Sequence, residues 1–219
     1  MNRLQLLARQ KDFAVIVKPQ GMDSERGAGQ ENVPAALAEL LACPEETIHP
    51  VHRLDRPAGG IMVYALSARG AAALSRSLSD NRFEKEYLAL AGRAPDAPQG
   101  RWTDLLYWDP RSRKAYAVSR PRKGGREASL SYRVESVSAS GTALLRIRLE
   151  TGRTHQIRVQ CASRGLPLVG DRRYGSRIPS PRLGLWCCSL KFPDPVTGEL
   201  LSFSCPPPAE APWDAFPIT

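Results

Sequence analysis

The chain has 219 residues, enough for one domain of ordinary size or for two small ones sharing a core. Lys and Arg total 31 against 22 Asp and Glu, so the net charge is +9, and 42% of the residues are hydrophobic. These values exclude a disordered or acid-rich chain and favour a polyanionic partner.

The predicted secondary structure alternates runs of strands with few helices. Helices are expected at 33–42 with Asn32 as cap, at 68–80 with Ser67 as cap, and at 155–163 with Gly165 as the stop. Strands are expected at 13–17, 61–66, 87–91, 102–107, 130–137, 143–149, 183–192 and 200–204. Turn residues between most strands favour antiparallel pairing. We therefore predict a single α+β domain with a mixed, mostly antiparallel central sheet flanked by helices.

One stretch of the sequence has no regular spacing of apolar residues. The residues around 109–128 are predicted to form an exposed insertion or hairpin, called the arm below.

Several classes of protein are excluded by single residue types. The five cysteines make no CxxC pair and the three histidines no metal-ligand pattern, so neither a disulfide framework nor a metalloenzyme is expected. Apolar runs fall short of the ~20 residues that cross a bilayer, and the first residues lack the apolar block of a signal peptide. We expect a cytoplasmic protein, with no membrane contact and no metal.

The positive charge is concentrated in two segments. Residues 111–133 hold eight basic side chains and one acid, and residues 151–182 hold seven and one. The net charges are therefore +7 and +6, on a remainder of −4. This asymmetry favours nucleic-acid contact, because arginine binds phosphate with a planar fork. The alternative is a solvated surface whose charge only confers solubility.

The run HRLDRPAGG at 52–60 is the densest group of reactive residue types. Asp55 lies between Arg53 and Arg56 and before a glycine pair that permits close approach of a backbone or ligand. Neighbouring guanidinium groups favour the ionised carboxylate, which suits a nucleophile better than a general acid. The alternative is that Asp55 only pairs with an arginine at a turn.

A second run, TGRTHQIR at 151–158, lies at a strand-to-helix junction. Backbone N–H groups at a helix start and the two arginines, Arg153 and Arg158, can bind an anion, either a phosphate or the Asp55 carboxylate. The alternative is a capped helix with surface arginines.

These two runs, together with KEY at 85–87, LVGD at 168–171 and VKPQG at 17–21, resemble the signature segments of the RluA-type pseudouridine synthases in order and rough spacing. The resemblance spans about 13–203. It implies an enzyme of the pseudouridine synthase fold that isomerises uridine in ribosomal or transfer RNA without cofactor or metal. Many members of the family carry a small N-terminal RNA-binding domain, for which we expect no room before Phe13, and we expect a monomer.

The resemblance also assigns roles to residues. Asp55 would be the catalytic aspartate, which attacks the ribose C1′, attacks the uracil ring, or removes a sugar proton. Tyr87 would stack on the target base, and Arg158, or less favourably Arg153, would pair with the catalytic carboxylate. Arg53 would fill the space that the flipped base leaves. Residues expected to contact the RNA are His52, Arg53, Arg153 and His155. The charge pattern, apart from the resemblance, adds Arg113, Lys114, Arg122 and Lys123 on the arm. Lys18 is either a further phosphate contact or a solvated turn lysine.

Besides Val17, where an asparagine is common in the family, three residues depart from the family pattern. Ala58-Gly59 replaces Thr-Ser, and Gln160 replaces His. They leave open a second class, a non-catalytic RNA-binding or ribosome-assembly protein on the same fold. A phosphate-ester hydrolase using Asp55 and His52 is disfavoured, because no metal cluster or phosphate loop accompanies them.

Overall fold

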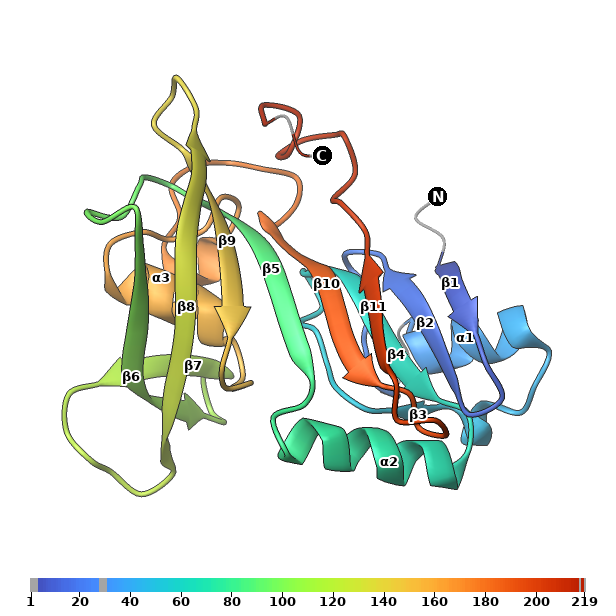
Figure 1. The fold of residues 1–219 in the computed structure, drawn as a ribbon. Coiled ribbons are helices and arrows are strands. Elements are labelled where there is room, and N and C mark those ends of the chain that lie inside the picture. The colour runs from blue at the N-terminus through green and yellow to red at the C-terminus, as the bar shows by residue number, and fades with distance from the viewer. Residues whose placement is uncertain (1–3, 28–30, 217, 219) are drawn as a thin grey trace. The chain divides into compact units, whose positions relative to one another are not determined.

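Two structural units are each formed by two stretches of the chain. In the computed structural model, which describes residues 4–27, 31–216 and 218, the first unit comprises Met1–Lys85 and Trp186–Pro207 and the second Glu86–Leu185 and Pro208–Thr219 (Figure 1). The chain passes from one unit to the other within β5 (Glu84–Ala91) and within β10 (Leu185–Pro193).

The first unit contains a mixed sheet. Its strands are β1 (Gln5–Arg9), β2 (Phe13–Lys18), β3 (His49–Pro50), β4 (Gly59–Ala65), β10 and β11 (Leu200–Ser204). They run in the order β1-β2-β4-β10, with β11 paired to β10 and β3 paired to β4. The β4–β10 pair is parallel and the other pairs are antiparallel. β2 and β4 are buried along their whole length, which explains their continuous apolar sequences.

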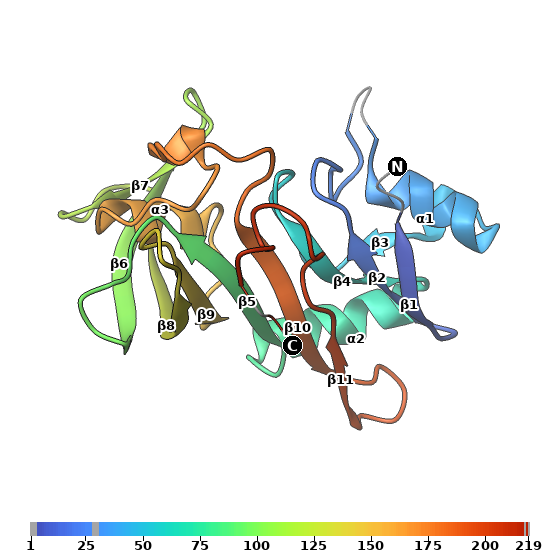
Figure 2. The same cartoon turned by 90° about the horizontal axis from the view of Figure 1, so that it is seen from above.

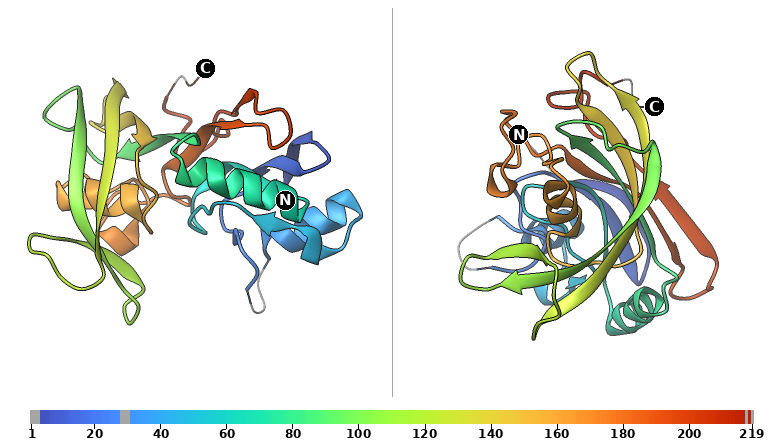
Figure 3. Two further views of the ribbon diagram at one scale, coloured as in Figure 1. Left: turned by 60° about the horizontal axis from the view of Figure 1, so that its bottom comes forward. Right: turned by 90° about the vertical axis from the view of Figure 1, so that its left-hand side faces the viewer.

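Helices α1 (Val33–Leu41) and α2 (Ala68–Ser79) belong to this unit, as does the short 3-10 helix Glu45–Thr47. Figure 3 shows α2 running alongside the sheet, where Leu74 is buried. Both predicted caps are confirmed: Asn32 accepts from the Ala35 amide at 2.9 Å and Ser67 from the Gly70 amide at 3.0 Å. The aromatic rings of Phe13, Phe83, Phe192 and Phe203 form a connected core cluster.

The second unit contains an antiparallel sheet in the order β5-β9-β8-β6-β7. Its other strands are β6 (Gln99–Asp109), β7 (Lys114–Val118), β8 (Gly125–Val137) and β9 (Ala143–Leu149). Figure 2 shows α3 (Gln156–Ser163) beside β6 and β7, and the 3-10 helix Arg172–Tyr174 follows it. A small core joins Leu106, Ala115, Ala128, Val159 and Tyr174.

The predicted fold class is confirmed, since the strands are mixed and mostly antiparallel and helices accompany them. The assignment of residues 1–219 to a single catalytic domain stays a prediction. Sequence reasoning missed β1 and β3 and gave no bounds for β7. Of the two alternatives for the arm, the structure supports the hairpin, because β7 pairs antiparallel with β6, and Ala115 in β7 is buried rather than exposed. No helix among the described residues is long and apolar enough to span a membrane.

Candidate active site

Asp55 lies in a turn that leads into β4. The Ala58 amide donates to the Asp55 carbonyl at 2.9 Å and closes the turn. The preceding residue, Leu54, is fixed by Ser24, whose Oγ accepts from the Leu54 amide at 3.1 Å and donates to the Leu54 carbonyl at 2.8 Å. Asp55 itself is half-buried. The backbone that carries this carboxylate is therefore held on both sides, while the side chain keeps access to solvent.

Lys18 braces the same turn from the end of β2. Its side chain has no exposed surface. Its Nζ donates to the carbonyls of Pro19 at 3.0 Å, Met22 at 2.8 Å and Arg56 at 3.2 Å. Burial lowers the pKa of Lys18 to about 7, and the carboxylates of Asp23 and Asp55 oppose that shift. The enclosure corrects both sequence alternatives, because the ammonium is neither solvated nor accessible to a phosphate.

The two arginines that flank Asp55 have different partners. Arg53 is exposed and pairs with Glu25, with Nη1 3.2 Å from Oε2. Arg56 donates from Nε to the Gly21 carbonyl at 2.8 Å and accepts from the Gly21 amide at its own carbonyl, also at 2.8 Å. Arg56 therefore fastens the Asp55 turn to the turn after β2, and Arg53 stays at the surface.

The glycine pair after the turn is required by close packing within the first unit. A Cβ on Gly59 would overlap the indole ring of Trp186, and one on Gly60 would overlap the backbone of Cys187. Gly60 also has a φ of +117°, which side chains rarely adopt. The serine of the family pattern would not fit at position 59 beside this tryptophan. The departure at Gly59 is therefore a packing adjustment to β10.

His52 does not face the solvent. It is 8% exposed, its Nε2 accepts from the Val63 amide at 3.3 Å, and its ring packs against Phe83 with centroids 5.3 Å apart. Burial, with a smaller contribution from Lys85, holds the pKa of His52 well below its usual range. An enclosed imidazole whose Nε2 already accepts from the Val63 amide is not placed to contact RNA or to take a proton from a substrate, which corrects the expectation for His52.

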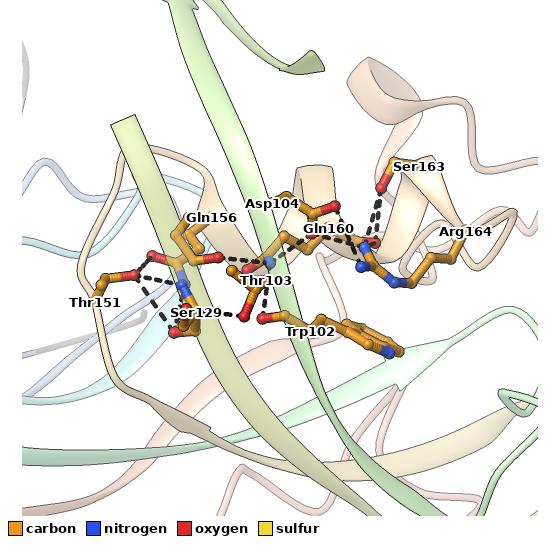
Figure 4. A network of polar contacts seen from close by, with 10 residues as sticks. Trp102, Thr103, Asp104, Ser129, Thr151, Gln156, Gln160, Ser163 and Arg164 are labelled. Atoms are coloured by element: carbon orange, nitrogen blue, oxygen red, sulfur yellow. Dashed lines mark hydrogen bonds and ion pairs between the residues drawn. The ribbon is translucent and has the colours of Figure 1, made fainter. Parts of the chain in front are cut away.

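In the second unit, side chains of the 151–158 run fasten the start of α3 to β8. Thr151 Oγ1 donates to Gln156 Oε1 at 2.8 Å and accepts from the Ser129 amide at 2.9 Å (Figure 4). Gln156 Nε2 donates to the Ser129 carbonyl at 3.0 Å, and its Oε1 also accepts from the Arg153 amide at 2.9 Å. This part of the motif is structural and fixes the helix that carries Arg158.

Gln160, the second departure from the family pattern, ties the same helix to β6 and β8. Its Nε2 donates to Asp104 Oδ2 at 2.7 Å and lies 3.2 Å from the Ala128 carbonyl (Figure 4). Asp104 also pairs with Arg164 at 2.8 Å. Since Gln160 has no exposed surface, this departure concerns the packing of α3.

Arg158 is 5% exposed and forms a two-point ion pair with Asp171. Nε lies 2.7 Å from Oδ2, and Nη2 lies 2.8 Å from Oδ1. Burial of Arg158 contradicts the alternative of a capped helix with surface arginines. Sequence reasoning recognised the segment around Asp171 but missed this pairing, since nothing in the spacing links positions 13 residues apart.

Tyr174 connects Arg158 with His155 and the arm. Its hydroxyl lies 2.9 Å from His155 Nδ1 and accepts from the Ala115 amide at 2.9 Å. Its ring lies 5.0 Å from the Arg158 guanidinium and 5.0 Å from Lys114 Nζ. His155 has a φ of +55°, a conformation rare outside glycine, so its bond to Tyr174 helps to hold a strained residue in place. Sequence reasoning did not select Tyr174.

Two further predicted residues differ in exposure. Arg153 is exposed and donates from Nε to the Glu127 carbonyl at 2.9 Å. Tyr87 is buried in β5, where it pairs in register with Ile147 of β9.

The arm presents its basic side chains to solvent. Arg113, Arg122 and Lys123 are exposed, and Lys114 is half-buried against Tyr174. Arg122 stacks on Tyr107, with Cζ 3.5 Å from the ring centre. Arg173 donates to the Arg113 carbonyl and so supports the turn between β6 and β7. Figure 1 shows the loop between β7 and β8 extending beyond the strands.

Among the described residues, no three His, Cys, Asp or Glu side chains are grouped to hold a metal ion. The five cysteines are free thiols, three of them buried.

Comparisons with known proteins agree on one family. The family model described as RNA pseudouridylate synthase matches residues 12–163. Ribosomal large subunit pseudouridine synthase D of Xanthomonas campestris pv. campestris is 34% identical over 232 residues, which cover 94% of this chain and 67% of the relative. Dual-specificity RNA pseudouridine synthase RluA of Pasteurella multocida is 32% identical and covers 89% of both chains.

The fold is also shared with the solved structure of Human RNA Pseudouridylate Synthase Domain Containing 1. The TM-score is 0.76 at 22% identity, over 94% of this chain and 84% of that one. With the matching family model and these relatives, the chain belongs to the RNA pseudouridylate synthases and is an enzyme of the RluA type.

Proposed function

We propose that the protein converts uridine to pseudouridine in RNA of the large ribosomal subunit, with Asp55 as the catalytic aspartate. The observation that carries this assignment is the Asp55 turn, in which Ser24, Lys18 and Arg56 fix the backbone around a half-buried aspartate. The choice of RNA is supported by the name of relatives that are 34% identical over 94% of this chain.

The reaction balances without an external reactant. The bond between C1′ of the ribose and N1 of the uracil breaks, and a bond between C1′ and C5 forms. The C5 proton leaves and N1 gains a proton, so neither oxidation nor reduction occurs. We therefore propose that no cofactor takes part, and that Asp55 acts at the ribose or the ring while the uracil stays bound.

The remaining roles follow from the family pattern. Tyr87 stacks on the target base, and Arg53, exposed beside the Asp55 turn, fills the space that the flipped base leaves. Arg158 holds the Asp55 carboxylate; a guanidinium has five N–H donors, so the two that bind Asp171 are compatible with a second acceptor. Arg153 and His155 contact the RNA.

The arm supplies general RNA affinity. Taking a base out of its stack costs a few kcal/mol, which contacts elsewhere on the RNA must offset. Exposed arginines on the arm neutralise phosphates and release their counterions. Because bacterial relatives carry ribosomal names, we also propose that the protein acts in the cytoplasm, as a monomer.

The test compares two asparagine variants on unmodified transcripts of large-subunit ribosomal RNA and of transfer RNA. Pseudouridine is detected by carbodiimide treatment and reverse-transcription stops. We expect Asp55→Asn to abolish the stops while RNA affinity stays within about tenfold, because the phosphate contacts survive. Asp96→Asn, at a fully exposed carboxylate, serves as the matched control and should leave the stops unchanged.

Full conversion by Asp55→Asn would remove Asp55 from the mechanism. Conversion confined to transfer RNA would support the enzymatic activity and show that ribosomal RNA is not the substrate.

A further inference from the structure

The β6–β7 hairpin that begins the arm carries two tyrosines, Tyr107 on β6 and Tyr116 on β7, on the face that points away from α3. In the β6–β7 ladder, Tyr107 lies opposite Tyr116 and Leu106 lies opposite Ala117. Side chains alternate along a strand, and Leu106 and Ala115 are buried in the core beside α3. Tyr107 and Tyr116 therefore share the opposite face. Tyr116 is 40% exposed, which is high for an aromatic side chain.

Each of these rings has a cation beside it. Arg122 Cζ lies 3.5 Å from the centre of the Tyr107 ring, and Lys114 Nζ lies 5.6 Å from that of Tyr116. The Tyr116 hydroxyl donates to Ser112 Oγ at 3.3 Å, which sets the direction of the ring. No acidic residue occurs between Arg111 and Arg126. The face is thus aromatic, oriented and surrounded by positive charge.

We propose that this face of the arm is a stacking site for unpaired nucleotides of the substrate RNA. The proposal rests on the proposed function for the identity of the polymer. A nucleobase stacks on Tyr116, and a second one packs on the outer face of the Arg122 guanidinium that already covers Tyr107. Phosphates of the same strand bind the neighbouring Lys114 and Lys123.

The chemistry distinguishes unpaired from paired RNA. A duplex hides the faces of its bases and offers only phosphates and groove edges, for which exposed tyrosines add nothing. Solubility or bulk attraction would need only the charges. An acidic protein segment would use the same charges but has no flat ring to cover Tyr116, so the aromatic pair favours single-stranded nucleic acid.

The experiment measures affinity by fluorescence anisotropy for two RNAs of equal length. One is a hairpin whose loop contains cytidine in place of uridine, so no reaction occurs, and the other is a blunt duplex. For the hairpin, we expect Tyr116→Leu to weaken binding about 5- to 100-fold, the effect of losing one stacked base. For the duplex the change should be under about twofold. Tyr116→Phe retains the ring and should bind the hairpin like the wild type.

A charge variant supplies the second readout. Lys123→Gln should weaken binding of both RNAs and lower the slope of log Kd against log salt by about 0.7 to 0.9, whereas Tyr116→Leu should leave that slope unchanged. Equal losses on hairpin and duplex, or no loss with Tyr116→Leu, would overturn the stacking site. So would a wild-type protein that binds an acidic peptide more tightly than the hairpin.

These outcomes are separate from catalysis. If loop nucleotides stack on Tyr116 but no pseudouridine forms, the stacking site is supported and the proposed function is refuted.

Discussion

Two basic segments of the second unit carry similar net charge and use it differently. In the segment 151–182, three of the seven arginines form ion pairs, Arg158 with Asp171, Arg164 with Asp104 and Arg182 with Glu210. The other four, at 153, 172, 173 and 177, are exposed. In the arm, six basic side chains are exposed, and none of them forms an ion pair with any described residue. They are Arg111, Arg113, Arg120, Arg122, Lys123 and Arg126.

The difference shows that the basic side chains behind the net charge of +9 do not all have the same role. Arg158 and Arg164 satisfy buried or half-buried carboxylates and hold α3 in place, whereas the exposed arginines of the arm remain available for phosphate. In the first unit, Lys18 is enclosed by carbonyls, and Arg53 forms a surface ion pair with Glu25. Removing a charge should therefore affect stability in one region and RNA affinity in the other.

The largest effect is expected at the buried ion pair. Asp171→Asn leaves the Arg158 guanidinium without its carboxylate at a site where both side chains are almost fully enclosed. We expect the free energy of unfolding, measured with urea, to fall by about 3 kcal/mol or more. Asp96→Asn, at an exposed carboxylate, should change it by less than about 0.5 kcal/mol.

A double variant separates structure from catalysis at the same pair. Replacing both members, as Arg158→Met with Asp171→Leu, should recover much of the lost stability because no charge stays buried. If Arg158 pairs with the Asp55 carboxylate as proposed, the double variant should form no pseudouridine although it folds. An Asp171→Asn protein as stable as the wild type would contradict the contrast drawn above.

Next in size is a comparison of two lysines. Lys18→Met leaves three carbonyls without their donor, and Lys123→Met removes an exposed arm charge. We expect the first variant to lose about 2 to 3 kcal/mol of unfolding free energy and most activity, because buried unsatisfied groups are unfavourable and the Asp55 turn loosens. The second should keep its stability. Similar urea curves for both would show that the enclosure of Lys18 has no energetic role.

A smaller effect is expected where the two basic segments meet. Tyr174→Phe keeps the ring between Lys114 and Arg158 but leaves the Ala115 amide and His155 Nδ1 without their partner. Stability should fall by about 2 kcal/mol. Tyr116→Phe removes only an exposed hydroxyl and is the matched control. If both variants unfold at the same urea concentration, the arm and α3 are not coupled through Tyr174.

Local sequence was sufficient for much of this molecule. Asn32 and Ser67 cap their helices as predicted, because capping depends on a few neighbouring residues. The strand at 143–149 has the predicted bounds. The motif runs also located the Asp55 turn and the start of α3, since each is a short continuous segment.

What the sequence could not supply depends on contacts between distant positions. The burial of Lys18 follows from carbonyls up to 38 residues away, and the pairing of Arg158 from a carboxylate beyond the end of its helix. β7 was hidden because the charges around it mask a short alternating strand. His52 was misjudged for the same reason, since nothing local shows that Phe83 covers it.

The enclosure of His52 also predicts a pH effect. Its pKa in the folded protein lies well below 6.5, so below pH 6.5 the unfolded chain binds a proton that the folded protein does not. The free energy of unfolding should therefore fall by about 1 kcal/mol between pH 6.5 and pH 5.5 on account of this residue. His52→Gln, which stays neutral and retains an acceptor for Val63, should give a flatter curve. If the free energy of unfolding depends on pH in the same way in both proteins, the titrating group is not His52.

The smallest effect on stability is expected in the arm, where the effect on RNA should be clear. Arg120→Gln with Lys123→Gln removes two exposed charges that form no ion pair with the described residues. Unfolding free energy should change by less than about 0.5 kcal/mol, while the slope of log Kd against log salt falls by about 1.4 to 1.8. Conversion at saturating RNA should persist, because these residues have no role in the chemistry proposed for Asp55. An unchanged affinity would mean that the charge of the arm serves solubility alone.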